Sequence, residues 1–404
     1  MCRPQARLGS MSPSVYEFFA GGGMARAGLG EHWTTLFAND IDEMKAEAYA
    51  RNWGDNGLVV KDVAKVSADE LPGRADLAWA SFPCQDLSLA GAGRGLGGTR
   101  SGTFWPFWRL MEQLDDAGRA PSVIALENVY GAVRSHGGKD FRAIADAFAQ
   151  LDYRVGAFLI DAKLFVPQSR LRLFVVGVKR SLNVPEGLVD DAPKEPWHPK
   201  PLREAVEGLS QEARAAWRWW SLPTPTGACV PLESVIEDEP KGVDWDAPEK
   251  TDYLLSLMSS VNLDKVVRAK ASGHRQVGTV YRRTRRDADG KRVQRAEVRF
   301  DGLSGCLRTP SGGSSRQTIL VVDGTSVRSR LLSTREAARL MGLPDAYLLP
   351  ERYNAAYHLA GDGVAVPVVR HLAQHLIEPI VALSSHGVRQ PKRKERMAIR
   401  ERIA

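Results

Sequence analysis

Cys84 is a candidate nucleophile because of its position in the chain. It lies in the run SFPCQDLSLAG, directly after the apolar segment Leu77–Ala80, which we expect to be a strand. A single cysteine is more often a small buried hydrophobic residue than a reactive group. A loop that follows a strand of a parallel sheet, however, lies on the face that binds ligands. A thiol there can attack a substrate where its surroundings stabilise the thiolate.

Glu127 offers an acid at the same edge of the expected sheet. It follows the apolar segment Val123–Leu126 in the run ALENVYG. A surface carboxylate near the start of a helix is the simpler interpretation. The position after an apolar strand favours function, because a partly buried acid can hold a proton at neutral pH and act as a general acid.

Arg170 and Arg172 stand at the start of the expected strand Leu171–Val178. Residues two apart in a strand point to one face, so we expect both guanidinium groups on the same side. Two arginines that enter an apolar strand need an anionic or carbonyl-rich partner. A structural salt bridge would also meet this need.

A glycine-rich turn follows the first expected strand, Val15–Phe19. Gly21 to Gly23 are adjacent in the run FFAGGGMARAGLG, and such a turn lets a ligand approach the backbone closely. The second expected strand ends at Asp40, where a carboxylate can accept both hydroxyl groups of a ribose. Asp62, after the third strand, can bind an adenine amino group or cap a helix. Turn and acid together predict a ligand that contains adenosine.

The elements that must position these residues alternate between strands and helices over residues 14–180. Helical patterns lie near 42–52, 103–115 and 139–150. Such alternation predicts a parallel sheet covered by helices on both faces. The expected strands are Val15–Phe19, Thr35–Ala38, Leu58–Val60, Leu77–Ala80, Val123–Leu126, Val155–Ile160 and Leu171–Val178.

Bulk properties indicate a globular protein without a membrane span. The chain has 404 residues, of which 43% are hydrophobic and 25% charged, as in ordinary globular proteins. No apolar run reaches the length of a membrane-spanning helix, and the first residues lack the apolar core of a secretory signal. The four cysteines, Cys2, Cys84, Cys229 and Cys306, form no CxxC pair, so we expect neither a structural zinc site nor a disulfide framework.

The composition changes after Lys179. Five prolines in 183–201 prevent a regular helix or central strand there. From about 185 to 328 we expect an irregular, loop-rich lobe, in which Asp289–Gly290 marks a hairpin turn. The net charge of +7 is concentrated in the segment 282–299 and in the tail 389–402. This clustering favours a polyanionic partner.

A regular pattern resumes at Ser333. Its spacing from Glu336 is that of a capping box at a helix start. A last apolar helix is expected over roughly 364–382. We expect this part of the chain to return to the first domain and the basic tail after it to be mobile.

Six motifs, taken in order, resemble those of the cytosine-5 DNA methyltransferases. The match covers residues 14–180 and 330–382. The motifs are FFAGGG, the triplet Pro83-Cys84-Gln85, the triplet Glu127-Asn128-Val129, the strand Gln168-x-Arg170-x-Arg172, the segment 335–340 with the Gly-Leu-Pro that follows, and GDGVAVP at 361–367. Four positions, Met24, Ile41, Ser81 and Asp362, depart from the usual pattern of the family.

The resemblance implies an α/β fold, namely a Rossmann-like S-adenosylmethionine-dependent methyltransferase domain with a smaller irregular target-recognition lobe. It implies a catalytic and cofactor-binding domain at 14–182, a target recognition domain at 183–329, a C-terminal segment at 330–383 that returns to the catalytic domain, and a basic tail at 384–404. The reaction would be methylation of carbon 5 of a flipped cytosine in duplex DNA.

Site residues follow from the same resemblance. The catalytic residues would be Cys84 as nucleophile, Glu127 as proton donor, Arg172 on the exocyclic oxygen of the base, and Arg170 in support of the same loop. No metal is expected. The residues expected to bind S-adenosylmethionine are Phe19, Gly21, Gly22, Gly23, Asp40, Ile41, Asp62, Val63, Pro83, Asp362, Gly363 and Val364. Those expected to bind DNA are Gln85, Ser88, Arg282, Arg283, Arg285, Arg286, Lys291, Arg292, Arg308 and Ser311.

The expected setting is the bacterial cytosol or nucleoid, or a phage genome, within restriction-modification. We expect a monomer that acts on double-stranded DNA, with any cognate restriction endonuclease acting separately. Two alternatives remain open. One is a cytosine-5 methyltransferase of RNA, such as tRNA, and the other is a non-catalytic DNA-binding protein that kept the fold.

Overall fold

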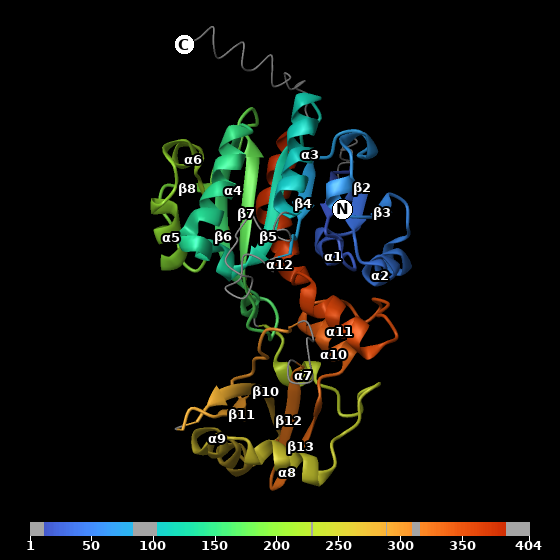
Figure 1. Cartoon of the computed structure of the whole chain (residues 1–404), viewed down its shortest axis with the longest axis vertical. Coiled ribbons are helices and arrows are strands. Elements are labelled where there is room, and N and C mark those ends of the chain that lie inside the picture. Colours follow the sequence, from blue (N-terminus) through green and yellow to red (C-terminus); the bar gives the residue numbers. More distant parts are fainter. Residues whose placement is uncertain (1–11, 84–102, 228, 288, 309–315, 385–404) are drawn as a thin grey trace, which may run out of the picture. The chain divides into compact units, whose positions relative to one another are not determined.

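The computed structural model describes residues 12–83, 103–227, 229–287, 289–308 and 316–384, which form two compact units (Figure 1). The first unit contains the described chain up to Ile160, residues 171–224 and the described chain from Val368 onward. The second unit contains the described parts of 161–170 and 225–367.

The first unit is built on a seven-stranded sheet in the order β3-β2-β1-β4-β5-β7-β6. Strands β1 to β5 pair in parallel. All seven expected strands are present, most of them one to three residues longer than the apolar segments that predicted them. They are β1 (Ser14–Phe18), β2 (Thr34–Asp40), β3 (Leu58–Val60), β4 (Leu77–Ala80), β5 (Val123–Val129), β6 (Tyr153–Asp161) and β7 (Leu171–Lys179).

The expectation of a wholly parallel sheet is wrong for β7, which runs antiparallel to β5. The connection explains the reversal. β7 lies beside β6 in the sheet, and only residues 162–170 separate the two strands along the chain. A parallel crossover needs about a dozen residues or more, usually with a helix, and this segment is too short for one.

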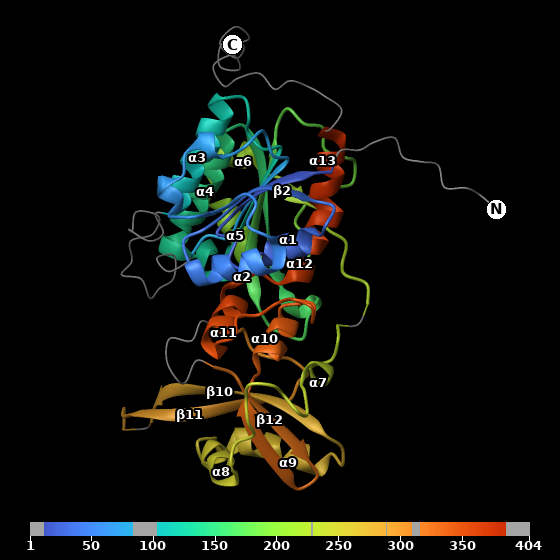
Figure 2. The same ribbon diagram turned by 90° about the vertical axis from the view of Figure 1, so that its right-hand side faces the viewer.

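Helices cover both faces of this sheet, as expected. Figure 2 shows α3 and α4 on one side and α13 on the other. The expected last helix is continuous over 366–384 but consists of α12, a π-helical turn over Ala373–Ile377 and α13. The helices are α1 (Met24–Leu29), α2 (Glu43–Trp53), α3 (Phe104–Asp116), α4 (Lys139–Gln150), α5 (Lys200–Glu207), α6 (Gln211–Ala216), α12 (Val366–Leu372) and α13 (Glu378–Ser384).

The spacing of large apolar residues in α3 explains how the first core forms. Phe104, Phe107, Trp108 and Met111 follow one another at intervals of three, one and three residues, so they share one helix face. All four are buried in the core cluster, and the Trp108 ring lies 4.8 Å from the ring of Phe148 in α4. Burial of each such side chain contributes about 2 kcal/mol.

The second unit contains a four-stranded antiparallel sheet in the order β11-β10-β12-β13. Leu254 and Val266 from its helices pack against Val280, Val298 and Leu320 from its strands to form a separate core. The helices are α7 (Leu232–Val235), α8 (Pro248–Ser256), α9 (Ser260–Ala271), α10 (Thr334–Leu340) and α11 (Tyr353–Asp362). The strands are β10 (Gln276–Arg286), β11 (Arg292–Arg299), β12 (Thr318–Asp323) and β13 (Ser326–Leu331).

The expectation of an irregular lobe is therefore wrong for its central part. The sheet was hidden in the sequence because arginines fill the outer half of β10, where an apolar alternation would normally mark a strand. The hairpin prediction is confirmed. Arg286 pairs with Arg292 across the turn, and the backbone N–H of Asp287 donates to the carbonyl of Lys291.

Residues 183–224 belong to the first unit, which differs from the expected boundary at 183. Leu202 of α5 and Ala213 of α6 are part of the first core. Trp217, after α6, packs its ring 5.9 Å from Phe141 of α4. Two short strands, β8 (Val189–Asp190) and β9 (Trp219–Trp220), pair within the same stretch. The prolines end regular elements there but do not separate the stretch from the first core.

The C-terminal segment also differs from the expectation, because residues 330–367 belong to the second unit. The predicted capping box is confirmed, since Ser333 and Glu336 cap α10 reciprocally. Glu336 in addition pairs with Arg330 of β13, and both side chains are fully buried. This pair fixes α10 to the second sheet, so that the chain returns to the first unit only from Val368.

In the part of the chain that the structure describes, no helix is long and apolar enough to cross a membrane.

Candidate active site

The glycine-rich turn after β1 is tied to the end of β2. Phe19 has a φ of 55°, which is rare for a residue with a side chain, and Gly21 and Gly23 also have positive φ. The backbone N–H of Gly21 donates to Oδ2 of Asp40 over 2.8 Å. Two parts of the predicted cofactor site are thus brought together, because the acid at the end of β2 holds the turn.

Gly21 and Gly23 of this turn are required for different physical reasons. A Cβ on Gly23 would lie 2.3 Å from Nε1 of Trp53, so only glycine fits there without movement of the tryptophan. A Cβ on Gly21 would meet nothing within 4 Å. The requirement at Gly21 is its left-handed backbone, and the open space beside it is available to a ligand.

The predicted adenosine-binding residues after β2 and β3 differ in exposure. Asp40 is nearly buried, and its second oxygen, Oδ1, accepts from the backbone N–H of Asp42. Ile41 is 66% exposed and presents an apolar surface. Asp62 accepts from the N–H of Ala64 and caps a 3-10 helix, which is the simpler of its two interpretations. Val63 is buried in the core, so only its backbone could face a ligand.

Glu17, inside β1, is a buried acid that the sequence interpretation missed. Its carboxylate accepts from the backbone N–H of Arg26 over 3.3 Å and from the hydroxyl of Tyr49 over 3.4 Å. Burial raises the pKa of Glu17 to about 7, because the charged form loses its hydration. The only signal in the sequence was an acid inside the apolar run VYEFF. Glu17 connects β1 to α1 and α2 beneath the glycine turn.

Glu127 and Arg172 form a nearly buried ion pair at the end of β5. The strand extends to Val129, so Glu127 lies within its last three residues and not after it. Its Oε1 lies 3.2 Å from Nε of Arg172 on the neighbouring strand β7. The carboxyl group is 8% exposed and the guanidinium group 16%. Two of the four predicted catalytic residues are therefore in contact.

Asn128 connects this strand to the segment that leads to Cys84. Its Nδ2 donates to the carbonyl of Phe82 over 3.2 Å, and its Oδ1 accepts from the N–H of Val129. Phe82 is buried and packs against Phe104. The sequence interpretation included Asn128 in a motif but gave it no role. Cys84 itself, with Gln85 and Ser88, lies outside the described residues.

The expectation that Arg170 and Arg172 share one face is wrong. β7 begins at Leu171, so strand alternation does not extend to Arg170. The buried guanidinium of Arg170 donates to the carbonyls of Leu307, Gly361 and Gly363 in the second unit. Arg170 has the carbonyl-rich partners that its burial requires, and these partners belong to backbone segments of the second unit.

The segment 361–364 is held by these bonds. α11 ends at Asp362, and Gly363 follows as its C-terminal cap. Val364 is buried, whereas Asp362 is exposed. The predicted cofactor residues of this segment lie in the second unit, while those of the glycine turn lie in the first.

Gln168 connects two other segments of the second unit through its side chain. Its side-chain amide donates to the carbonyl of Leu340, and its Oε1 accepts from the backbone N–H of Leu307. The side chain is fully buried. Like Asn128, Gln168 was quoted in a motif without a role, and its structural function depends on contacts distant in sequence.

The described residues that were predicted to bind DNA lie mainly on the β10–β11 hairpin. Arg283 and Arg285 pair with Glu297, and Nη1 of Arg286 donates to the carbonyl of Gly290. The guanidinium of Arg308 lies 5.9 Å from the centre of the Tyr281 ring. Ser311 lies outside the described residues. Arg282, Lys291 and Arg292 complete the hairpin set.

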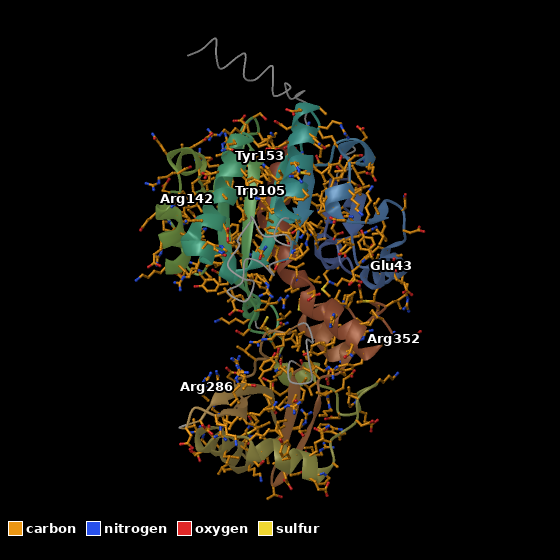
Figure 3. All side chains as sticks on the ribbon, viewed as in Figure 1. Glu43, Trp105, Arg142, Tyr153, Arg286 and Arg352 are labelled. Carbon is orange, nitrogen blue, oxygen red and sulfur yellow. The ribbon has the colours of Figure 1, made fainter. Side chains whose placement is uncertain are left out.

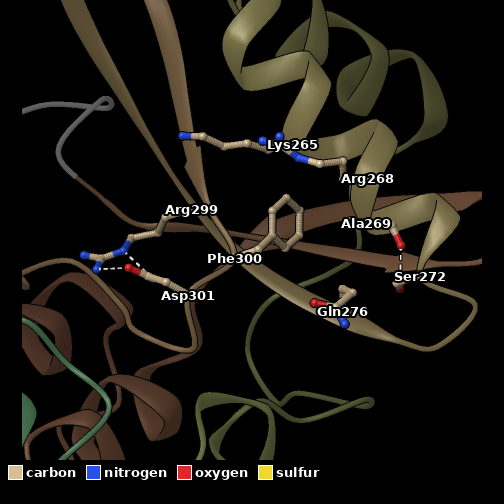
Figure 4. Close-up of a pocket in the computed structure, with 8 residues that line it drawn as sticks. All are labelled: Lys265, Arg268, Ala269, Ser272, Gln276, Arg299, Phe300 and Asp301. Atoms are coloured by element: carbon tan, nitrogen blue, oxygen red, sulfur yellow. Dashed lines mark hydrogen bonds and ion pairs between the residues drawn. The ribbon is translucent and has the colours of Figure 1, made fainter.

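A cavity of about 420 Å³ lies in the second unit between α9 and the end of β11 (Figure 4). It does not involve the glycine turn or the Glu127 pair. Its cationic lining would repel a sulfonium ion, so we do not assign the cofactor to it. Its charged lining residues are Lys265, Arg268, Arg299 and Asp301. Within the described residues, no three His, Cys, Asp or Glu side chains are grouped to hold a metal ion.

Comparison with known proteins gives a consistent result. A family model described as C-5 cytosine-specific DNA methylase matches residues 14–378. Type II methyltransferase M1.ScrFI of Lactococcus lactis subsp. cremoris is 25% identical over 375 residues, 90% of this chain and 78% of the relative. Type II methyltransferase M.DsaV of Dactylococcopsis salina is 26% identical over 348 residues, 85% of this chain and 80% of the relative.

A solved structure supports the same fold. That of the Entamoeba histolytica methyltransferase EhMeth aligns with 91% of this chain and 99% of its own, with a TM-score of 0.60 and 14% identity. The predicted α/β methyltransferase fold is thus confirmed, with the corrections to strand direction and to the lobe given above. Because the family model spans most of the sequence, the chain belongs to the C-5 cytosine-specific DNA methylases.

Proposed function

We propose that this chain transfers the methyl group of S-adenosylmethionine to carbon 5 of a cytosine in duplex DNA, with Cys84 as the nucleophile. The observation that carries the proposal is the buried pair of Glu127 and Arg172. Glu127 of this pair lies on the strand whose Asn128 binds the backbone two residues before Cys84. An acid and a cation on neighbouring strands, together with a cysteine thiolate, provide the groups that a covalent attack on a pyrimidine needs.

The residues of the first unit fit an adenosine cofactor with a carboxylate end. The open space beside Gly21 allows close approach to the backbone, and Asp40 stands where a ribose hydroxyl would be bound. The exposed side chain of Ile41 offers an apolar surface for the adenine. When bound, the cofactor supplies an electrophilic methyl group on a sulfonium. We assign Phe19, Gly22, Gly23, Asp62, Val63 and Pro83 to the same site. For Asp362, Gly363 and Val364 we propose a cofactor role on the strength of the motif GDGVAVP alone.

The first step is attack of the Cys84 thiolate on carbon 6 of the cytosine ring. The new carbon–sulfur bond pushes an electron pair towards ring nitrogen 3. Glu127, in its protonated form, donates its proton there and becomes the carboxylate that pairs with Arg172. Arg172 holds the Glu127 carboxylate and the exocyclic oxygen of the base, so it stabilises the charge that develops. Carbon 5 becomes an enamine carbon and can take a methyl group.

The second step restores the ring. After carbon 5 has taken the methyl group, a base removes its proton, the carbon–sulfur bond breaks and the thiolate returns to Cys84. The proton on nitrogen 3 returns to Glu127. Carbon 6 is inaccessible in a stacked duplex, so the base must be turned out of the helix. Arg170 supports the reaction as a positioning residue for the segment 361–364.

We further propose protection of DNA in a restriction-modification system, on the strength of relatives that are named Type II methyltransferases. Double-stranded DNA would be the only obligatory macromolecular partner. The enzyme would act as a monomer in the cytoplasm, and a cognate endonuclease would act separately.

The test is methyl transfer from labelled S-adenosylmethionine to duplex DNA, followed by bisulfite sequencing of DNA from cells that express the chain. We expect label in DNA, one methylated sequence and no transfer to tRNA. Cys84→Ser should abolish transfer, whereas Cys229→Ser, which changes a cysteine of the second unit, should not. Transfer to tRNA alone, or full activity of Cys84→Ser, would refute the proposal.

A further inference from the structure

The β10–β11 hairpin extends beyond the sheet to which it belongs. β10 pairs with β12 through residues 276–280. Residues 281–286 pair with β11, up to the opposition of Arg286 and Arg292. We call residues 281–297 the ribbon. Figure 3 labels Arg286, which lies near its free end. A two-stranded ribbon has dimensions that fit the major groove of DNA.

The ribbon places like charges directly opposite each other. Arg283 faces Arg295, and Arg286 faces Arg292. Such pairs destabilise a hairpin, and they become favourable when a polyanion lies against them. The two pairs have different parity along β10, so they lie on opposite faces. Both faces of the ribbon therefore present arginine, as expected for a segment that enters a groove between two phosphate backbones.

Glu297 organises one of these faces. It shares the face of Arg283 and Arg285, since it pairs with Tyr281 in the register. Its Oε2 lies 3.1 Å from Nε of Arg283, and its Oε1 lies 3.0 Å from Nε of Arg285. One carboxylate thus orients two guanidinium groups. All three side chains are about 36 to 51% exposed, so DNA can reach them.

The chemistry of this triad distinguishes between two kinds of DNA contact. A carboxylate repels every phosphate, whatever the sequence, and so weakens binding to any DNA. A guanidinium group held in one orientation can still donate to the acceptor edge of a guanine, which depends on the sequence. A fixed orientation also reduces the entropy lost on binding.

We propose that Glu297 is a positioning residue for sequence specificity: it orients Arg283 and Arg285 towards base edges and disfavours DNA that lacks the correct site. Arg286 and Arg292, at the free end, bind phosphates. This inference depends on the proposed function, because it requires DNA as the substrate.

The experiment compares two variants that each remove one negative charge. Glu297→Gln acts on the triad. Asp323→Asn is the matched control, because Asp323 is exposed and ends β12 beside the start of β10, away from the ribbon. The full chain is titrated with two duplexes of equal length by fluorescence anisotropy in a series of salt concentrations. One duplex carries the site found by bisulfite sequencing, and the other differs from it by one base pair.

We expect Glu297→Gln to bind the altered duplex about 3-fold more tightly or better. The ratio of the two affinities should fall correspondingly, and the salt dependence should steepen by about one phosphate contact. Asp323→Asn should leave the ratio unchanged, and Glu297→Asp, which keeps the charge, should restore most of it. An unchanged ratio in Glu297→Gln, or an equal change in both variants, would overturn the proposal.

A second pair of variants tests whether Arg283 contacts bases and Arg286 contacts phosphates, without a change at Glu297. Arg283→Gln should weaken binding of the correct duplex by about 5- to 150-fold and reduce the ratio, whereas Arg286→Gln should weaken both duplexes equally. Equal effects of the two variants would overturn the assignment. If wild type methylates no DNA, the proposed function fails; if it methylates DNA but the ratios do not change, only this inference fails.

Discussion

Glu127 shows at the scale of one residue how a carboxylate can be held ready for catalysis. Its carboxyl group is nearly buried at the edge of the sheet and contacts the guanidinium group of Arg172. Its neighbour Asn128 is used for structure and binds Phe82. The proposed proton donor, Glu127, and the positioning residue, Asn128, are therefore adjacent in one strand. A substitution of Glu127 can leave the contact between Asn128 and Phe82 intact.

We expect Glu127→Gln to lower kcat by about 10²- to 10⁴-fold with little change in the KM for DNA. The amide keeps the shape of the side chain but cannot transfer a proton as a carboxylic acid does. Single-turnover methylation of a duplex measures this effect, and thermal unfolding of the variant is the control for folding. A variant with the kcat of wild type would exclude Glu127 as the proton donor.

The buried acid Glu17 predicts a pH dependence of stability. Burial raises its pKa from 4.5 to about 7. Below pH 4.5 the group is protonated in both the folded and the unfolded chain and favours neither. As the pH rises from 4.5 to 7, the unfolded chain loses the proton first, so the folded state loses up to about 3 kcal/mol.

Glu17→Gln should remove this dependence, because the amide does not titrate. Urea unfolding at pH 5 and at pH 7 gives the free energy of unfolding of both proteins. We expect the stability of the variant relative to wild type to increase between the two pH values. A difference that stays constant or decreases would show that Glu17 does not have a raised pKa.

A buried ion pair between Asp115, near the end of α3, and Lys179 of β7 joins elements of the first unit. Nζ of Lys179, the last residue of β7, lies 2.7 Å from Oδ1 of Asp115 and also donates to the carbonyl of Leu151. The two charged side chains are 1% and 2% exposed. Nζ further lies 4.3 Å from the centre of the Tyr153 ring. The pair connects a helix to two strands on one edge of the sheet.

We expect Asp115→Asn to destabilise the folded protein by about 3–5 kcal/mol, because Lys179 then remains buried without a counter-ion. The double variant Asp115→Leu with Lys179→Met should recover much of this loss, since it removes both charges. Urea unfolding measures both effects. If Asp115→Asn unfolds at the urea concentration of wild type, the pair contributes nothing to stability.

At the scale of the whole molecule, the positive charge of the chain is unevenly distributed. The net charge is +7, and the ribbon of the second unit carries many of its arginines. The first unit, by contrast, contains the acids at the ends of β2, β3 and β5. The arginines that we propose to contact the DNA duplex thus lie in one unit, and the acids that we propose to act on the flipped base and the ribose lie in the other.

We expect DNA binding to weaken by about 10³-fold between 50 and 200 mM salt, the value for roughly six phosphate contacts. The proposed phosphate contacts are the cations of the ribbon other than Arg283 and Arg285, together with Arg308, and each releases counter-ions from DNA when it binds. Anisotropy titrations at several salt concentrations give the slope. An affinity that does not depend on salt would mean that these side chains do not contact phosphates.

The sequence by itself determined the class of fold of the first unit and the identity of the chemical groups. Strands β4 and β5 were predictable because their buried residues form continuous apolar runs, and polar residues follow these runs. Glu127, Asp40 and the glycine turn were predicted from their positions at the ends of expected strands. The capping box at Ser333 was predicted from its spacing to Glu336. These signals are local, because each depends on neighbours in the chain.

Only the tertiary structure decided which partners these groups have. The direction of β7, the sheet under the arginines of β10 and the separate environments of Arg170 and Arg172 depend on pairing between segments far apart in sequence. The same is true of Glu17, whose acidity depends on complete burial beneath the turn. Burial and pairing are properties of the packed chain, so spacing along the sequence cannot specify them.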